Sequence, residues 1–361
     1  MKCADWRKPE PHFDEASGKK AVNFKRPGQY CLPFISIPVK DNRTEKENER
    51  KVNTMLNSND RPIKLGMHTY TLHFFGLGES WGFGKDYAFP QTMNLMQLMD
   101  YAVEWELDGL QITKVDLQNT EPAHLAEVKA AAEERGLFLE FNASFDAPSD
   151  SRVNCTVREA LQIAKAIGSD LAKFSLDVKR PRPHYATCFH PDVMRQLAVR
   201  YEEFKEALPL VEELGLKVAI EHHCDTYADE VVWLVDQIDH PMVGTCLDTV
   251  NSVSVTEGPE EAVKKLASRA FCCHFADNAL VIDPLGAHWI GVPHGTGDID
   301  LPKVLKVLRE QSTLDRVIFE NEIPFLRPDE PLEEAREREL QACKESIAYL
   351  RNVLQIGVRN R

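Results

Sequence analysis

Three short apolar runs in the second half of the chain each end at a residue whose side chain can bind a metal ion. The runs are Lys217–Ile220, Met242–Leu247 and Ala270–Cys273, and they are followed directly by Glu221, Asp248 and His274. Segments with helical periodicity separate the runs, which predicts alternating strands and helices. In an α/β barrel the C-terminal ends of such strands converge on one mouth, where active sites lie. We therefore expect these three side chains to meet, and two carboxylates with an imidazole suit a divalent cation.

The regular part of the chain repeats this alternation and gives eight predicted strands. They are Ile63–Thr69, Gly109–Thr113, Leu137–Phe141, Leu171–Leu176, Lys217–Ile220, Met242–Leu247, Ala270–Cys273 and Arg316–Phe319. Most are continuous apolar runs, as strands buried on both faces must be, and their spacing leaves room for a crossover helix after each. The predicted fold class is α/β, a (β/α)8 TIM barrel. An open, doubly wound sheet is the alternative, but no glycine-rich phosphate-binding sequence follows any strand.

Predicted helices lie between these strands and after the last one. They include Gln91–Trp105, Glu121–Arg135, Asn154–Ile167, His190–Leu214, Pro302–Glu310 and a C-terminal helix, Leu332–Leu354. Pro209 lies inside the long helix His190–Leu214 and should kink or split it, because proline removes a backbone hydrogen bond.

The chain is expected to have three parts: an N-terminal extension (residues 1–61), the barrel (62–328) and the C-terminal helix (329–361). The extension is polar and charged except for the segment Tyr30–Val39. It is either a flexible tail with one docked segment or an arm that packs on a second subunit of a homo-oligomer.

Composition excludes several classes of partner. The formal net charge of −14 repels nucleic acid and anionic membranes, and no dense basic patch offsets it. No stretch approaches the roughly 18 apolar residues of a membrane span. The nine cysteines include no paired C-x-x-C spacing, and the N-terminus lacks the apolar core of a secretory signal, so we expect a reducing, cytoplasmic location.

Glu320 follows the eighth strand and adds a fourth polar group at consecutive strand ends. Three carboxylates and one imidazole favour a single divalent ion, with Mn²⁺ our first expectation and Mg²⁺, Co²⁺ or Zn²⁺ as alternatives. Glu322 is a competing strand-eight candidate, because residues two apart on a strand point the same way. The alternative for each residue taken alone is that it caps a helix or faces solvent.

The stretches IEHHCDTYADEVVWLV, VGTCLDTVNS, CCHFADN and HGTGDIDLPKVL resemble the xylose isomerase-like family of sugar isomerases and epimerases. The resemblance covers roughly Ile63–Pro324. It implies a TIM barrel with one divalent metal held at the ends of strands five to eight, roles that fall on Glu221, Asp248, His274 and Glu320. It also matches His223 to a histidine two places after the first ligand.

The sequence departs from one branch of that family. Ketohexose epimerases usually carry an arginine shortly after the strand-seven histidine, and HFADNALVIDPLG has none. The chain also resembles the metal-bearing subunits of C-glycoside deglycosidases, which act on 3-oxo sugars. That reading implies a possible second small subunit, so the resemblance leaves the substrate, a sugar or a glycoside, open.

The residue types themselves suggest a reaction. A metal that binds a hydroxyl and a carbonyl of a sugar acidifies the carbon between them, and a base can then form an enediolate. Glu221 and Glu320 are the candidate proton-transfer groups, with His223 as an alternative base or as a supporting residue. Isomerisation or epimerisation is the expected outcome, and loss of a β-substituent, a lyase step, is the alternative.

Other polar side chains near strand ends are candidates for binding sugar hydroxyls. They are His68, Glu140, Lys173, Trp289 and His294, and the alternative for each is a structural role. Two further functions are alternatives. An endonuclease-like barrel needs about three metals and a basic face, which the acidic charge disfavours. A non-catalytic sugar-binding barrel is expected to have lost ligands, and all four candidates are present.

Overall fold

The computed structural model describes residues 61–80, 89–181, 186–284, 286–327 and 329–358. The chain divides into two compact units, Met1–Lys51 and Val52–Arg361, and the described residues all belong to the second. The expected docking of Tyr30–Val39, and almost all of the predicted N-terminal extension, lie outside the described residues.

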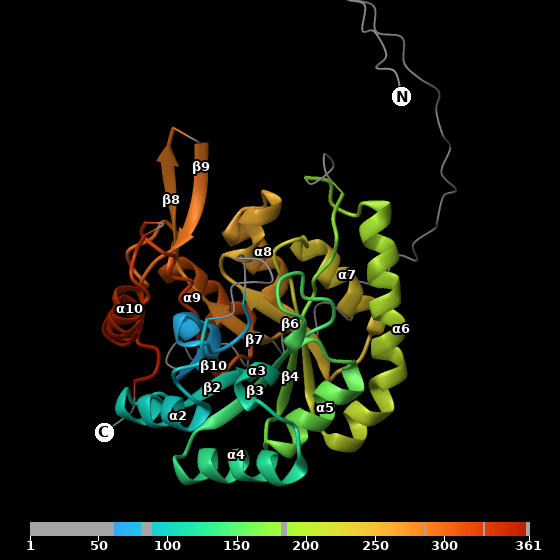
Figure 1. Cartoon of the computed structure of the whole chain (residues 1–361). Helices are drawn as coiled ribbons and strands as arrows, with labels where there is room; N and C mark the ends of the chain where they lie inside the picture. Colours follow the sequence, from blue (N-terminus) through green and yellow to red (C-terminus); the bar gives the residue numbers. More distant parts are fainter. Residues whose placement is uncertain (1–60, 81–88, 182–185, 285, 328, 359–361) are drawn as a thin grey trace, which may run out of the picture. The chain divides into compact units, whose positions relative to one another are not determined.

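Eight parallel strands close into a barrel, which confirms the predicted TIM-barrel fold (Figure 1). The strands are β1 (Lys64–His68), β2 (Gly109–Thr113), β3 (Phe138–Ser144), β4 (Leu171–Ser175), β5 (Lys217–Glu221), β6 (Val243–Asp248), β7 (Ala270–Phe275) and β10 (Arg316–Phe319). Each strand pairs with the next in this order, and β10 pairs with β1 to close the ring. The β7–β10 ladder is short, with two paired positions, Ile318 with His274 and Phe319 with Phe275.

Helices surround the barrel and cover its apolar outer surface (Figure 1). The main ones are α2 (Leu95–Glu104), α4 (Pro122–Glu134), α5 (Val157–Ala166), α6 (Pro191–Leu214), α7 (Ala228–Ile238), α8 (Pro259–Leu266), α9 (Leu301–Gln311) and α10 (Leu332–Asn352). The predicted split at Pro209 is wrong, because α6 continues through it. Buried Phe204, Ala207 and Leu210 pack this part of α6 against the core, which offsets the missing backbone bond.

A β-hairpin that the sequence analysis did not predict follows the seventh strand. β8 (Asn278–Asp283) and β9 (Gly286–Gly291) pair antiparallel, and the hairpin stands out beyond the barrel (Figure 1). The alternating exposure along β8 is typical of a strand with one face toward solvent. The sequence prediction missed it because the polar ends and Pro284 obscure that alternation.

The barrel interior is apolar near the floor and polar above it. Leu171, Ala219, Cys246, Cys272 and Ile318 form a small buried cluster inside the ring. The ring of Phe138 packs against the floor, where Gly66 and Gly109 leave room for it. A Cβ atom on Gly109 would lie 2.4 Å from that ring, so only glycine fits there.

The C-terminal helix α10 packs against the 3₁₀ segment η1 (Thr69–Phe75), which follows β1. Glu339 Oε1 accepts a hydrogen bond from the backbone N–H of Phe74 (3.2 Å) and lies 2.8 Å from His73 Nδ1. Arg336 Nε donates to the carbonyl of Phe74 (2.9 Å). These contacts fix one wall of the barrel mouth. Among the described helices, none combines the length and apolar composition that a bilayer span requires.

Candidate metal centre

A small polar pocket lies at the C-terminal ends of the strands, with a cavity volume of about 20 Å³. Its walls are formed by His68, Tyr70, Glu79, Asn142, Lys173, Ser175, Glu221, His223, Asn251, His274, Glu320 and Glu322. Strand alternation explains why the strand-end groups face inward. Glu221, Asp248, His274 and Glu320 each lie two positions after a residue of the buried interior cluster.

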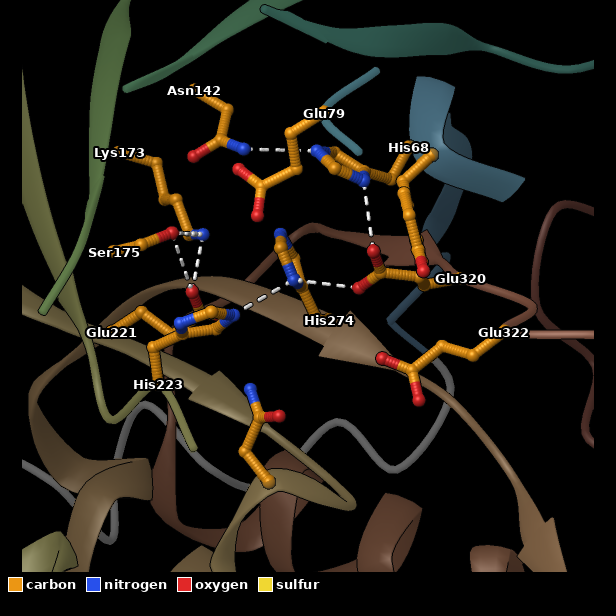
Figure 2. A pocket seen from close by; sticks show the side chains of 12 residues that line it. His68, Glu79, Asn142, Lys173, Ser175, Glu221, His223, His274, Glu320 and Glu322 are labelled. Atoms are coloured by element: carbon orange, nitrogen blue, oxygen red, sulfur yellow. Dashed lines mark hydrogen bonds and ion pairs between the residues drawn. The ribbon is translucent and has the colours of Figure 1, made fainter. Parts of the chain in front are cut away.

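His274 lies at the centre of the acidic groups (Figure 2). Its Nδ1 atom is 3.0 Å from Glu221 Oε1, 3.7 Å from Asp248 Oδ2 and 3.0 Å from Glu320 Oε2. One potential ligand atom each from Glu221, Asp248 and His274 falls within a 4.8 Å group. The strand-end pattern thus brings all four predicted ligands together.

Each of the three carboxylates uses one oxygen to contact the protein and turns the other toward His274. Glu221 Oε2 pairs with the ammonium of Lys173 and accepts from Ser175 Oγ (3.1 Å). Asp248 Oδ1 accepts from two backbone N–H groups, and Glu320 Oε1 lies 2.8 Å from His68 Nδ1. The converging atoms are therefore three carboxylate oxygens and one imidazole nitrogen.

The electrostatics of this cluster suit a cation. Burial disfavours the ionised form of Glu221, but Lys173 and His274 outweigh burial and hold its pKa well below the usual value. Burial also opposes the charge on His274, yet Glu221 and Glu320 hold its pKa well above the usual value. Burial and the charge of Glu221 raise the pKa of Asp248 to about 7. The cluster thus retains protons where a divalent ion could balance the negative charge.

The donor set fits such an ion. Buried Glu221 Oε1 faces His274 Nδ1 at 3.0 Å and accepts no other hydrogen bond from the described residues, whereas Oε2 is held by Lys173 and Ser175. Three hard oxygens and one borderline nitrogen match the preferences of Mn²⁺, Mg²⁺ and Zn²⁺. Glu322 lines the same pocket but makes no ion pair with His274 among the described side chains, so the geometry favours Glu320 as the strand-eight candidate.

His223 forms a separate polar pair at the pocket wall. Its Nδ1 lies 2.6 Å from Asp177 Oδ1, and Ser144 Oγ donates to the other carboxylate oxygen of Asp177. Burial lowers the pKa of His223, but neighbouring groups that include Asp177 raise it well above the usual value overall. The pair resembles in geometry a base with an orienting carboxylate.

Of the five predicted substrate-binding residues, two line the pocket and three lie outside it. His68 and Lys173 line the pocket, where a side chain that binds substrate would have to lie. Glu140 lies below the pocket, fully buried, and contacts Gln111 and Arg316. His294 is buried behind β7, where its Nε2 lies 2.6 Å from the carbonyl of Phe275. Trp289 lies on β9 and packs against the apolar core rather than lining the pocket.

Several pocket residues were missed from the sequence. Glu79 follows η1, and burial raises its pKa to about 7, while the charge of His223 opposes that rise. Asn142 and Ser175 face the mouth from β3 and β4, and Asn142 Nδ2 lies 3.0 Å from His68 Nε2. A polar residue two positions beyond another inward-facing one was the available signal at both strands.

Residues 99–352 match the sequence profile of the xylose isomerase-like TIM barrel. The chain belongs to this family. A relative in Pectobacterium atrosepticum, 3-oxo-isoapionate decarboxylase, is 24% identical over 267 residues, which cover 73% of this chain and 87% of the relative.

Solved structures of the family share the fold. D-psicose 3-epimerase from Clostridium cellulolyticum H10, solved with D-tagatose, has a TM-score of 0.56 at 16% identity and covers 82% of this chain and 100% of its own. A xylose isomerase-like protein from Mycobacterium smegmatis, solved with magnesium, has a TM-score of 0.52 at 18% identity, covering 80% and 98%. The proteins similar to this chain thus include an epimerase, a decarboxylase and one protein solved with magnesium.

Proposed function

We propose that this protein is a divalent-metal-dependent isomerase or epimerase that moves a proton at the carbon next to a sugar carbonyl. The observation that carries the proposal is the placement of Glu221 and Glu320 on either side of His274 (Figure 2). Together with Asp248 they would hold one ion, for which Mn²⁺ is our first choice.

Each carboxylate has its own supporting partner. Lys173 and Ser175 hold one oxygen of Glu221, while His68 contacts one oxygen of Glu320. A bound divalent cation would polarise a carbonyl and an adjacent hydroxyl of the substrate, and so acidify the carbon between them. One carboxylate would then remove the proton from one face of that carbon. The other would return a proton to the opposite face, which inverts the centre, or to the neighbouring carbon, which isomerises the sugar.

The remaining pocket groups would orient the substrate. Lys173 on β4, His68 on β1 and Asn142 on β3 offer donors and acceptors to sugar hydroxyls. His223, held by Asp177, would bind a hydroxyl at the opposite wall. The similarity in fold to D-psicose 3-epimerase supports this class of reaction.

A lyase acting on an oxidised sugar, either a decarboxylase or a deglycosidase, is the second candidate. Two observations favour it: the similarity to 3-oxo-isoapionate decarboxylase and the imidazole of His223, which Asp177 orients at the pocket wall. A lyase needs one base only, because departure of the leaving group completes the reaction.

Incubation of the Mn²⁺-loaded protein with ketoses and 3-oxo-glycosides in D₂O tests both candidates. The proposal expects solvent deuterium at a sugar carbon, with the product an isomer of the same mass apart from the label. A shortened or aglycone-free product would instead identify the lyase. Absence of exchange with every substrate, in protein that has bound the metal, would contradict both.

A further inference from the structure

A row of polar side chains crosses the barrel interior beneath His274. Gln111 on β2 and Glu140 on β3 are fully buried, and Arg316 at the start of β10 reaches them from the opposite end of the barrel. Apolar side chains usually fill this part of a TIM barrel. None of the three lines the pocket, so substrate contact does not explain them.

The three residues and His274 form one continuous chain of contacts. Arg316 Nε donates to Glu140 Oε1 (2.6 Å), and Gln111 Nε2 donates to Glu140 Oε2 (2.9 Å). Gln111 Oε1 lies 2.7 Å from His274 Nε2. Arg316 is held in turn by Asp170 at 2.5 Å and by the ring of Phe138.

The chemistry of the groups fixes the direction of every bond. A guanidinium can only donate, so Glu140 accepts, and as a carboxylate it accepts at both oxygens. Gln111 must therefore turn its NH₂ group to Glu140 and its carbonyl oxygen to His274. A carbonyl oxygen can only accept, so the Nε2 atom of His274 must carry a proton. The lone pair used for a metal then lies on Nδ1, the atom that faces the three carboxylates.

We propose that Arg316, Glu140 and Gln111 are positioning residues that fix the tautomer of His274 and so prepare Nδ1 to bind a divalent cation. This inference rests on the metal site of the proposed function, but not on which reaction occurs there. It also explains why a charged glutamate occupies the barrel interior: the carboxylate is the one group in the row that accepts from both neighbours.

Replacing Glu140 with glutamine tests the direction of the hydrogen bonds in this row, because glutamine has nearly the same shape as glutamate. Glutamine offers one acceptor and one donor, so either Arg316 or Gln111 would meet a donor. Since arginine cannot accept, Gln111 would turn over and present its NH₂ group to His274, which favours a proton on Nδ1. The affinity for Mn²⁺, measured by competition with a chelator, should fall about 10–100-fold, as is typical when a residue supporting a metal ligand is changed.

A second substitution that restores Mn²⁺ affinity would show that these residues position His274 rather than only stabilise the fold. In the double variant Glu140→Gln/Arg316→Met, the new glutamine can turn its amino group to the vacated side and accept from Gln111 again. We expect Mn²⁺ affinity to recover to within about threefold of the wild type, whereas two purely structural losses would combine. Glu330→Gln is the matched control, because Glu330 is also buried and paired with an arginine, Arg338, away from the pocket. It should leave the affinity unchanged.

Gln111→Met provides an independent variant that keeps the length of the side chain and disturbs no charge. It removes the acceptor for His274 Nε2, so affinity should again fall about 10–100-fold. Wild-type affinity in folded Gln111→Met, or failure of the double variant to bind better than Glu140→Gln, would overturn the inference. Failure of the proposed function looks different: the wild-type protein would bind Mn²⁺ and respond to these changes, yet exchange no substrate proton.

Discussion

Replacing Asp248 with asparagine separates the charge of this side chain from its shape. Oδ1 of Asp248 accepts from the backbone N–H groups of Val250 (2.6 Å) and Asn251 (2.8 Å). Only the carbonyl of an asparagine can accept those bonds, so its NH₂ group must take the place of Oδ2, which lies 3.7 Å from His274 Nδ1. A hydrogen-bond donor would then point at the candidate cation position, where the wild type presents an anionic oxygen.

Without metal, this substitution should stabilise the protein. Burial and the charge of Glu221 raise the pKa of Asp248 from 3.8 to about 7. The folded protein therefore holds this proton more tightly than the unfolded chain, and the stability that the proton provides is lost as pH rises from about 4 to 7. A pKa difference of about 3 corresponds to about 4 kcal/mol. Asparagine does not titrate, so at pH 8 the metal-free variant should gain up to about 4 kcal/mol in free energy of unfolding over the wild type, and little at pH 4.

With metal the gap at pH 8 should narrow by about 2.7 kcal/mol, because the ion stabilises the wild type more than a variant that binds it 100-fold more weakly. Saturation at 1,000 times the dissociation constant adds about 4 kcal/mol to the wild type. The variant has lost an anionic ligand, so its Mn²⁺ affinity should fall at least 100-fold, beyond the effect typical of supporting residues. Urea unfolding at pH 4.5 and pH 8, with Mn²⁺ and with a chelator, measures both effects.

Glu322→Gln is the matched control for this experiment. Burial and the charge of Glu320 raise the pKa of Glu322 to about 8, so this substitution also neutralises a buried carboxyl group of the pocket. It should retain Mn²⁺ affinity to within about tenfold, the lower limit for supporting residues. The reasoning is refuted if Asp248→Asn binds Mn²⁺ as well as Glu322→Gln does, or if the metal-free Asp248→Asn protein is no more stable than the wild type at pH 8.

Four further predictions concern catalysis, packing and assembly. Glu320→Gln should lower turnover by roughly 10²–10⁴-fold and Glu322→Gln much less; the opposite ranking in a steady-state assay would make Glu322 the strand-eight group. His223→Ala should keep the metal by elemental analysis, and complete loss of proton exchange in that variant would assign the base to His223 and favour the lyase. His294→Ala should cost about 2–4 kcal/mol in urea unfolding while leaving KM unchanged, because His294 lies outside the pocket. Deleting residues 1–61 should reduce the mass found by light scattering if that segment joins the subunits of a homo-oligomer, and an unchanged mass would exclude that role.

The strand-end residues could be located from the sequence because parallel strands share one direction. Once β5, β6, β7 and β10 are in register, the residue that ends each apolar run must face the same mouth. Asp248 and His274 are directly paired across β6 and β7, so their proximity follows from the backbone alone. The family resemblance then pointed to the same residues.

The supporting residues could not be located in this way. Gln111 contacts His274 across the barrel, 163 positions away in the chain, and nothing in the run GLQIT distinguishes it from a polar residue facing a helix. Glu140 was expected to bind substrate because it lies near the end of the predicted third strand. In the structure β3 continues to Ser144, which leaves Glu140 well below the mouth. His294 was expected to bind substrate, but its backbone N–H donates to Ser346 Oγ on α10, 52 positions away, a contact that the local sequence does not reveal.

The short β7–β10 ladder suggests that an ion at the candidate metal centre would also stabilise the closed barrel. Only two paired positions join these strands, whereas β4 and β5 share five. His274 lies in this ladder and Glu320 directly follows β10, so an ion held by both would cross-link the two neighbouring strands that share the fewest paired positions in the ring. Removal of the ion should therefore speed amide hydrogen exchange first along β7 and β10, where local opening has the fewest backbone bonds to break. The proposed metal site would then stabilise the closed barrel in addition to its proposed role in the reaction.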